Sequence, residues 1–167
     1  FVGSNVVINV DAVDSGDGGT AIVWADGSTE FTGTITGRGA GFAEVSGKET
    51  LAFNGHVDLR GHNGELGTLL LDPDDILVTG TGDTDLEGDV LFDGDAQKWT
   101  GVAAGGDEST TGTGNEVSAI AITTALGVAA VELLATTSIT VADDIVTTNT
   151  GTLTLTAVTD SIAINSQ

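Results

Sequence analysis

The chain contains no cysteine, methionine or tyrosine, and only one proline. The absence of cysteine excludes a disulfide framework and a thiol nucleophile. Because Pro73 is the only proline, few backbone donors are removed from any β-ladder. Aromatic residues make up 4% of the chain against 40% hydrophobic residues, so the core must consist mostly of Val, Ile, Leu and Ala. These side chains suit regularly stacked β-strands.

Basic side chains are also scarce. The chain has twenty-five acidic and four basic residues, which gives a formal net charge of −21. The basic residues are Arg38, Lys48, Arg60 and Lys98. Such a surface repels the phosphates of nucleic acids and anionic lipids, so neither is expected as a partner. It favours solubility and cations, and salt or divalent ions would relieve repulsion between copies. No apolar run approaches the roughly 18 residues of a membrane span, so none is expected.

Short alternating apolar runs recur between residues 19 and 78, separated by corners rich in Gly, Asp and Asn. Their spacing is roughly twenty residues, and Ile35, Val57 and Ile76 mark successive repeats. Strands that recur at a fixed period without intervening helices predict a coil of β-strands stacked on itself. A length of 167 residues predicts one domain that can bury a core.

The chain divides into three parts: β-coil at 1–79, an acidic glycine-rich insertion at 80–114, and further β-coil at 115–167. Between 117 and 134 a partial helical stripe competes with two short runs that suit buried strands, and Asn115 or Ser118 is placed to cap a helix. The expected strands are 6–10, 21–24, 30–36, 43–46, 50–53, 56–59, 68–71, 76–79, 138–141, 152–156 and 161–164.

Three segments of the repeat region carry a family resemblance. They are AIVWADGST from Ala21, GFAEVSGK from Gly41 and GTLLLDPDDI from Gly67. In this order and spacing they resemble the consecutive signature segments of filamentous-haemagglutinin-type adhesins, which are large β-helical exoproteins that bacteria export by two-partner secretion. The resemblance covers about residues 19–78. It is looser from 117 to 164, and 80–114 shows none.

The resemblance implies an all-β, right-handed parallel β-helix with one short helix near 118–126. The composition of 80–114 adds an acidic loop insertion to this fold. The resemblance also implies secretion to the bacterial cell surface. The chain begins at Phe1 without an export signal or an amino-terminal secretion domain. We therefore expect either a piece of a longer protein or a short relative that works as a subunit.

The most enzyme-like cluster is His56, Asp58 and His62. On an alternating strand His56, Asp58 and Arg60 share one face, opposite Val57 and Leu59. If the apolar pair faces the core, the polar residues form a solvated face. The chain has no nucleophile-elbow motif and few basic residues to bind an acidic sugar, so no catalytic residues and no enzyme are expected.

The insertion contains a possible calcium loop. Asp83, Asp85, Glu87 and Asp89 supply oxygens at alternate positions, with a glycine where such a loop would turn. Gly94 stands where the final bidentate Glu would be, with Asp93 and Asp95 beside it. The alternative is a solvated acidic loop that needs no ion. A weaker acidic turn contains Asp11, Asp14 and Asp17.

Together these features predict a structural or adhesive module of a secreted bacterial surface protein. Its partners would be a cell-surface or matrix receptor or glycan, and either the rest of a longer chain or other copies of itself. A self-assembling filament subunit is the alternative, because neither end of the sequence contains a recognisable polar cap. A polysaccharide-degrading β-helix enzyme is a third possibility.

Trp24 and Phe31 are expected in the core or at its corners, near Ile35 or the neighbouring turn.

Overall fold

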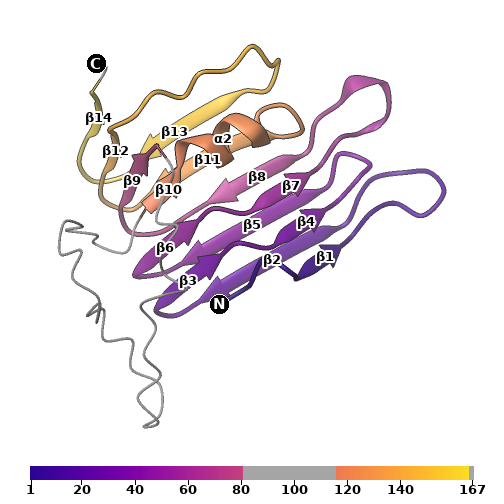
Figure 1. The fold of residues 1–167 in the computed structure, drawn as a ribbon, viewed down its shortest axis with the longest axis horizontal. Coiled ribbons are helices and arrows are strands. Elements are labelled where there is room, and N and C mark those ends of the chain that lie inside the picture. The colour runs from indigo at the N-terminus through magenta and orange to yellow at the C-terminus, as the bar shows by residue number, and fades with distance from the viewer. Residues whose placement is uncertain (81–115, 166–167) are drawn as a thin grey trace, which may run out of the picture.

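The chain folds into a parallel β-solenoid of about five turns (Figure 1). The computed structural model describes residues 1–80 and 116–165. Fourteen strands in these residues form three sheets of five, six and three strands, and every pair within the sheets is parallel. The stacked β-coil expected from the sequence is confirmed. The acidic insertion expected at 80–114 lies, apart from Gly80, outside the described residues.

The first part of the chain contains nine strands and one 3-10 turn. They are β1 (Val7–Asn9), β2 (Thr20–Ala25), β3 (Ser28–Phe31), β4 (Thr34–Thr36), β5 (Phe42–Gly47), β6 (Thr50–Phe53), β7 (His56–Asp58), η1 (His62–Gly64), β8 (Thr68–Leu71) and β9 (Ile76–Thr79). The second part contains β10 (Glu116–Ser118), α2 (Ala119–Ala125), β11 (Ala130–Ala135), β12 (Ile139–Val141), β13 (Leu153–Ala157) and β14 (Ile162–Ile164).

Each complete early turn contributes one strand to each sheet. The strand order is β13-β11-β8-β5-β2 in the five-stranded sheet, β14-β12-β9-β10-β6-β3 in the six-stranded sheet and β1-β4-β7 in the three-stranded sheet. Because neighbouring strands lie about 4.8 Å apart, equivalent side chains of successive turns stack directly on one another.

The interior consists of such stacked columns. Successive residues of a strand point to opposite faces, so one residue in two enters the core. Two columns cross the five-stranded sheet: Ala21, Ala43, Leu69, Val131 and Leu153, and beside it Val23, Val45, Leu71, Leu133 and Leu155. One column crosses the six-stranded sheet: Phe31, Phe53, Val117, Val78 and Val141 are buried, and the column ends at Ile164, which is 68% exposed.

Aromatic stacking and close backbone contacts tighten the first turns. The rings of Phe31 and Phe53 are nearly parallel, with centroids 5.7 Å apart. Gly41 and Gly67 begin two of the segments that carry the family resemblance, and each lies directly before a strand of the five-stranded sheet. A Cβ on Gly67 would collide with the carbonyl oxygen of Gly41, so this corner requires glycine.

The helix α2 replaces a strand of the three-stranded sheet after β7. Ser118 caps it, since its side chain accepts a hydrogen bond from the backbone N–H of Ala121. The short helix expected near 118–126 is therefore confirmed. Strand β10 was not expected; it lies between β6 and β9, which gives the six-stranded sheet one strand more than its five-stranded neighbour. No helix among residues 1–80 and 116–165 is long and apolar enough to cross a membrane.

Trp24 was expected in the core or at its corners, and the core position is wrong. Phe31 is fully buried, but Trp24 is 53% exposed. Strand alternation explains the difference, because Ala21 and Val23 fill the interior columns and Trp24 shares the outer face of β2 with Ile22.

Two details of the predicted repeat also need correction. Ile35 stacks on Val57, but Ile76 belongs to a different sheet, where it pairs with Ile139. The strand expected at 30–36 is two strands, β3 and β4, separated by a corner at residues 32–33. Both errors arose because a run of apolar residues does not show where the chain turns from one sheet to the next.

We expect Leu69→Ala to lower the free energy of unfolding by about 2–5 kcal/mol, because it removes a fully buried side chain from the middle of a stacked column. The matched control is Leu70→Ala, one residue along on the outer face of β8, which should cost about 1 kcal/mol or less. Chemical denaturation followed by circular dichroism measures both. Equal losses would contradict the register of β8.

We also expect Gly67→Ala to destabilise the fold by about 1–3 kcal/mol, since the added methyl group must displace the backbone of the preceding turn. Gly27→Ala is the control, because its added Cβ would meet only a Glu49 oxygen at 3.9 Å. The difference in melting temperature between the two variants tests this prediction.

Candidate functional site

A charged cluster lies at one end of the three-stranded sheet, where its strands lead into the corners before the five-stranded sheet. Asn9 and Asp58 occupy one outward column, because they pair with opposite sides of Thr36. Backbone pairing continues past the strand ends, and the N–H groups of Ala12 and Gly39 donate to the carbonyls of Arg38 and Arg60, each at 2.9 Å. Asp11, Arg38 and Arg60 therefore emerge from successive turns.

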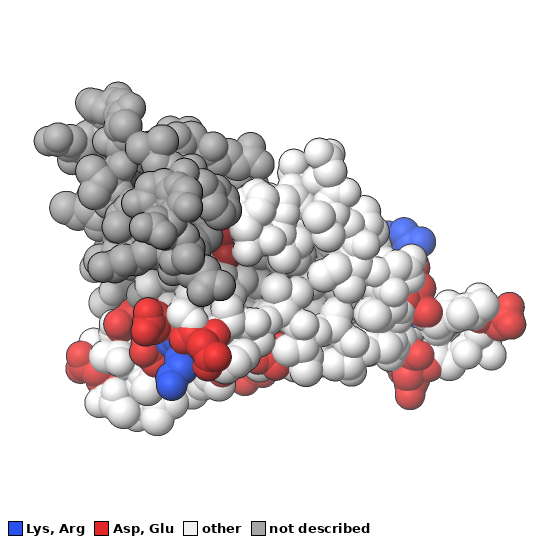
Figure 2. Space-filling model, turned by 90° about the horizontal axis from the view of Figure 1, so that it is seen from below, with Lys and Arg blue, Asp and Glu red and all other residues white. Residues whose placement is uncertain are grey.

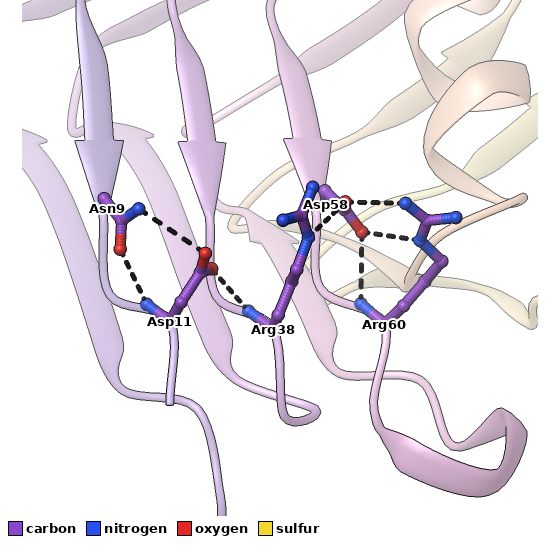
Figure 3. Close-up of polar contacts among 5 residues, drawn as sticks. All are labelled: Asn9, Asp11, Arg38, Asp58 and Arg60. Atoms are coloured by element: carbon purple, nitrogen blue, oxygen red, sulfur yellow. Dashed lines mark hydrogen bonds and ion pairs between the residues drawn. The ribbon is translucent and has the colours of Figure 1, made fainter. Parts of the chain in front are cut away.

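Two guanidinium groups share the carboxylate of Asp58 (Figure 3). Arg38 donates from Nε to Oδ2 at 2.9 Å, and Arg60 donates from Nε to Oδ1 and from an Nη to Oδ2, both at 2.7 Å. Asp11 joins the turns differently, because its Oδ1 accepts the backbone N–H of Arg38 at 2.8 Å while Asn9 contacts its other oxygen. The cluster thus bridges three turns.

These contacts shift the pKa of Asp58 well below its ordinary value. The side-chain hydrogen bonds from Arg60 are the largest cause; burial opposes the shift, and the hydrogen bond from Arg38 reinforces it. The same pair raises the pKa of Arg60. Only 15% of the Asp58 side chain is exposed, against 60% for Arg38 and 56% for Arg60. The carboxylate is therefore covered by two guanidiniums that themselves face solvent.

The register predicted for this strand is confirmed. Val57 and Leu59 are buried, and His56 and Arg60 are exposed. Asp58 is the exception: it was expected in solvent but is mostly covered, because the two arginines close over it. Its hydrogen bonds go to Arg38 and Arg60, and a carboxylate held by two guanidiniums is a weak proton acceptor.

Sequence reasoning missed Asn9 and Arg38 as members of this cluster and assigned Asp11 to a different acidic turn. The signal that could have found Arg38 is the repeat itself, because Arg38 and Arg60 lie 22 residues apart, as do the paired residues Thr36 and Asp58. Asp11 and Asn9 could not be placed this way, since the loop before β2 is longer than the corner before β5.

The proposed calcium ligands Asp83, Asp85, Glu87, Asp89 and Asp93 all lie outside the described residues. Within the described ranges, no three His, Asp or Glu side chains gather closely enough to hold a metal ion, and this includes the turn with Asp11, Asp14 and Asp17. Near the corner between β8 and β9, burial and the neighbouring charge of Asp74 raise the pKa of Asp72.

Comparison of the chain with models of known protein families, with characterised proteins and with solved structures found no match. The structure by itself establishes a parallel β-solenoid, which is a fold compatible with a β-helical exoprotein, and a charged cluster on its surface.

We expect Asp58→Asn to lower the free energy of unfolding by about 1 kcal/mol at neutral pH, since it leaves two arginines without their counter-ion. The folded-state pKa of Asp58 is depressed, so its contribution is fully present above the unfolded-state pKa of about 3.9. It is lost as pH falls below that value and through the folded-state pKa.

Urea denaturation of both proteins between about pH 7 and pH 2 measures this difference. The gap should be constant above about pH 5 and shrink below about pH 4. Asp26→Asn removes the same charge from an exposed corner and should show no comparable gap. A gap that widens on acidification would contradict the prediction.

Proposed function

We propose that this chain is a structural and adhesive module of a secreted bacterial surface protein, in which the outer faces of a stiff β-solenoid bind a cell or matrix. The observation that carries the proposal is the continuous stacking of the core. Columns of stacked side chains run from the first complete turn to the last; they are buried in the interior turns and partly exposed in the last one, and parallel backbone pairing accompanies them. An element of this kind resists bending because each turn is held by both neighbours.

The family resemblance supports the proposal through architecture. Its second and third segments begin at Gly41 and Gly67, the close-packed corners, and continue into β5 and β8. Val45 and Leu71 from these segments stack on each other in the core. The residues that resemble the adhesin family are thus the residues that build a regular turn. The resemblance therefore supports the proposal of a rod and does not point to any particular receptor.

Contact surfaces belong on the outer faces, because the interior is filled. The cluster around Asp58 presents two exposed guanidiniums at fixed positions on adjacent turns, in a chain with few other basic groups. Arginine held in this way keeps unused N–H donors for a partner and loses little conformational freedom on binding. Such a surface suits adhesion through an extended face.

Beads that display the chain should attach to bacterial cells or extracellular matrix under flow more strongly than albumin-coated beads. The double variant Arg38→Gln/Arg60→Gln should reduce attachment severalfold and keep the β-rich circular dichroism spectrum, since both side chains are largely exposed. Lys48→Gln removes a positive charge from a different corner and serves as the control. Attachment no better than that of albumin beads would refute an adhesive role.

Filament formation by head-to-tail stacking stays a prediction, and so does the expectation that the chain is not an enzyme. Electron microscopy of the purified chain separates the structural possibilities, because single short rods fit a module and long fibres fit a filament subunit.

A further inference from the structure

The only proline of the chain, Pro73, follows an aspartate at the corner between β8 and β9. Peptide bonds between aspartate and proline break in acid more readily than other peptide bonds, because the side-chain carboxyl is held beside its own backbone carbonyl carbon. Proline has no N–H, so the side chain of Asp72 cannot instead form a cyclic imide with the nitrogen of the next residue. The surroundings of Asp72 in the fold therefore decide how fast this bond breaks.

A buried hydroxyl points at the carbonyl oxygen of this bond. Val45 pairs with Leu71, so the next residues, Ser46 and Asp72, lie side by side on adjacent turns. Ser46 is 1% exposed, and its Oγ donates a hydrogen bond to the carbonyl oxygen of Asp72 at 2.5 Å. Negative charge develops on a carbonyl oxygen when a nucleophile adds to its carbon, and a preorganised donor stabilises that charge. Since Ser46 is distant in the sequence, only the folded chain supplies this donor.

The same corner keeps the carboxyl of Asp72 protonated to a greater extent than that of an ordinary aspartate. Burial is the larger cause of its raised pKa, and the charge of Asp74 is the second. The third carboxylate of the corner, Asp75, is engaged elsewhere, because it accepts hydrogen bonds from the backbone N–H of Ser138 at 3.1 Å and from its Oγ at 2.7 Å. In mild acid a larger share of Asp72 therefore carries the proton that cleavage of the bond needs.

Charges on neighbouring turns also act on this corner. The charged residues on the strands and corners stacked with β8 and its corner are Asp26, Glu44, Lys48, Glu49 and Glu132. The following corner, at residues 136–138, carries no charge. Figure 2 shows acidic groups gathered around a single basic group at one extremity of the molecule. The acidic groups disfavour an ionised Asp72 and Lys48 favours it, and the upward shift of the pKa shows that burial and Asp74 outweigh Lys48.

We propose that the Asp72–Pro73 bond is a self-cleavage site, at which the folded chain divides itself between β8 and β9 in mild acid. An oxygen of the protonated Asp72 carboxyl adds to the carbon of the Asp72 backbone carbonyl and closes a ring, while Ser46 Oγ stabilises the negative charge on the carbonyl oxygen. The carboxyl proton passes to the nitrogen of Pro73, the C–N bond breaks, and Pro73 leaves as a secondary amine. Water then opens the cyclic anhydride and leaves two carboxyl groups on Asp72.

Cleavage at this bond interrupts the chain without dismantling the solenoid. Strand β8 in the first fragment pairs with β11 in the second, and β6 in the first pairs with β10 in the second. The fragments 1–72 and 73–167 therefore stay joined by parallel backbone pairing, and they separate only when the protein is denatured.

The experiment follows cleavage of the 167-residue chain between about pH 4.5 and about pH 7 by denaturing gel electrophoresis and mass spectrometry. Fragments 1–72 and 73–167 should form faster as the pH falls. In urea at the same pH, cleavage should be at least about tenfold slower, because unfolding removes Ser46 from the carbonyl oxygen. Ser46→Ala should slow cleavage of the folded chain to a similar extent. Thr50→Ala is the control, since it removes a corner hydroxyl that bonds to Ser28 and should leave the rate unchanged.

Further variants test the chemistry of the step. Asp72→Glu moves the carboxyl away by one methylene group, and Pro73→Ala replaces the leaving group, so both should nearly abolish cleavage. Asp74→Asn should shift the pH profile of cleavage to lower pH, because it removes the charge that helps to raise the pKa of Asp72.

Circular dichroism identifies the variants that fold. If Ser46→Ala fails to fold, the comparison of the unmodified chain with and without urea and the pH profile of Asp74→Asn still decide the outcome. Equal or faster cleavage in urea would overturn the proposal, and so would an unchanged rate in folded Ser46→Ala. An unmodified chain that stays intact throughout the pH range would overturn it as well.

Discussion

Parallel backbone pairing between successive turns is the constraint on which the whole structure depends. It fixes the separation of neighbouring strands at about 4.8 Å and holds equivalent residues in register. A side chain in the core must therefore pack directly on its equivalents above and below. This explains why small and β-branched residues dominate the interior, and why Phe31 and Phe53 occur as a stacked pair.

The same register organises the surface. Thr36 and Asp58 pair across two turns, and the backbone pairing continues to Arg38 and Arg60. Repetition alone would place two arginines in adjacent turns and create repulsion, but Asp58 lies between them and accepts hydrogen bonds from both. The charged cluster therefore forms because the repeat places Arg38 and Arg60 in adjacent turns and Asp58 lies between them as their counter-ion.

Departures from regular repetition give the molecule its individual features. Strand β10 separates β6 from β9 in one sheet while β5 and β8 remain direct neighbours in another. After β10 the chain forms α2 and no further strand of the three-stranded sheet among the described residues, and α2 packs against β7.

The sequence by itself determined the class of fold and much of its local detail. Strands at 50–53, 68–71 and 76–79 coincide with β6, β8 and β9, and Ser118 caps the short helix. Period-two alternation also predicted that Val57 and Leu59 are buried. These properties depend on local patterns, because the identity of alternate residues decides which face of a strand is apolar.

Only the tertiary structure decided which turns meet and what covers a surface residue. The assignment of Ile76 to a different sheet, the insertion of β10 and the exposure of Trp24 all depend on where the chain turns and on which strands become neighbours. Asp58 is covered because Arg38, twenty residues earlier, reaches it from the adjacent turn. Contacts of this kind follow from three-dimensional register, which local sequence patterns do not specify.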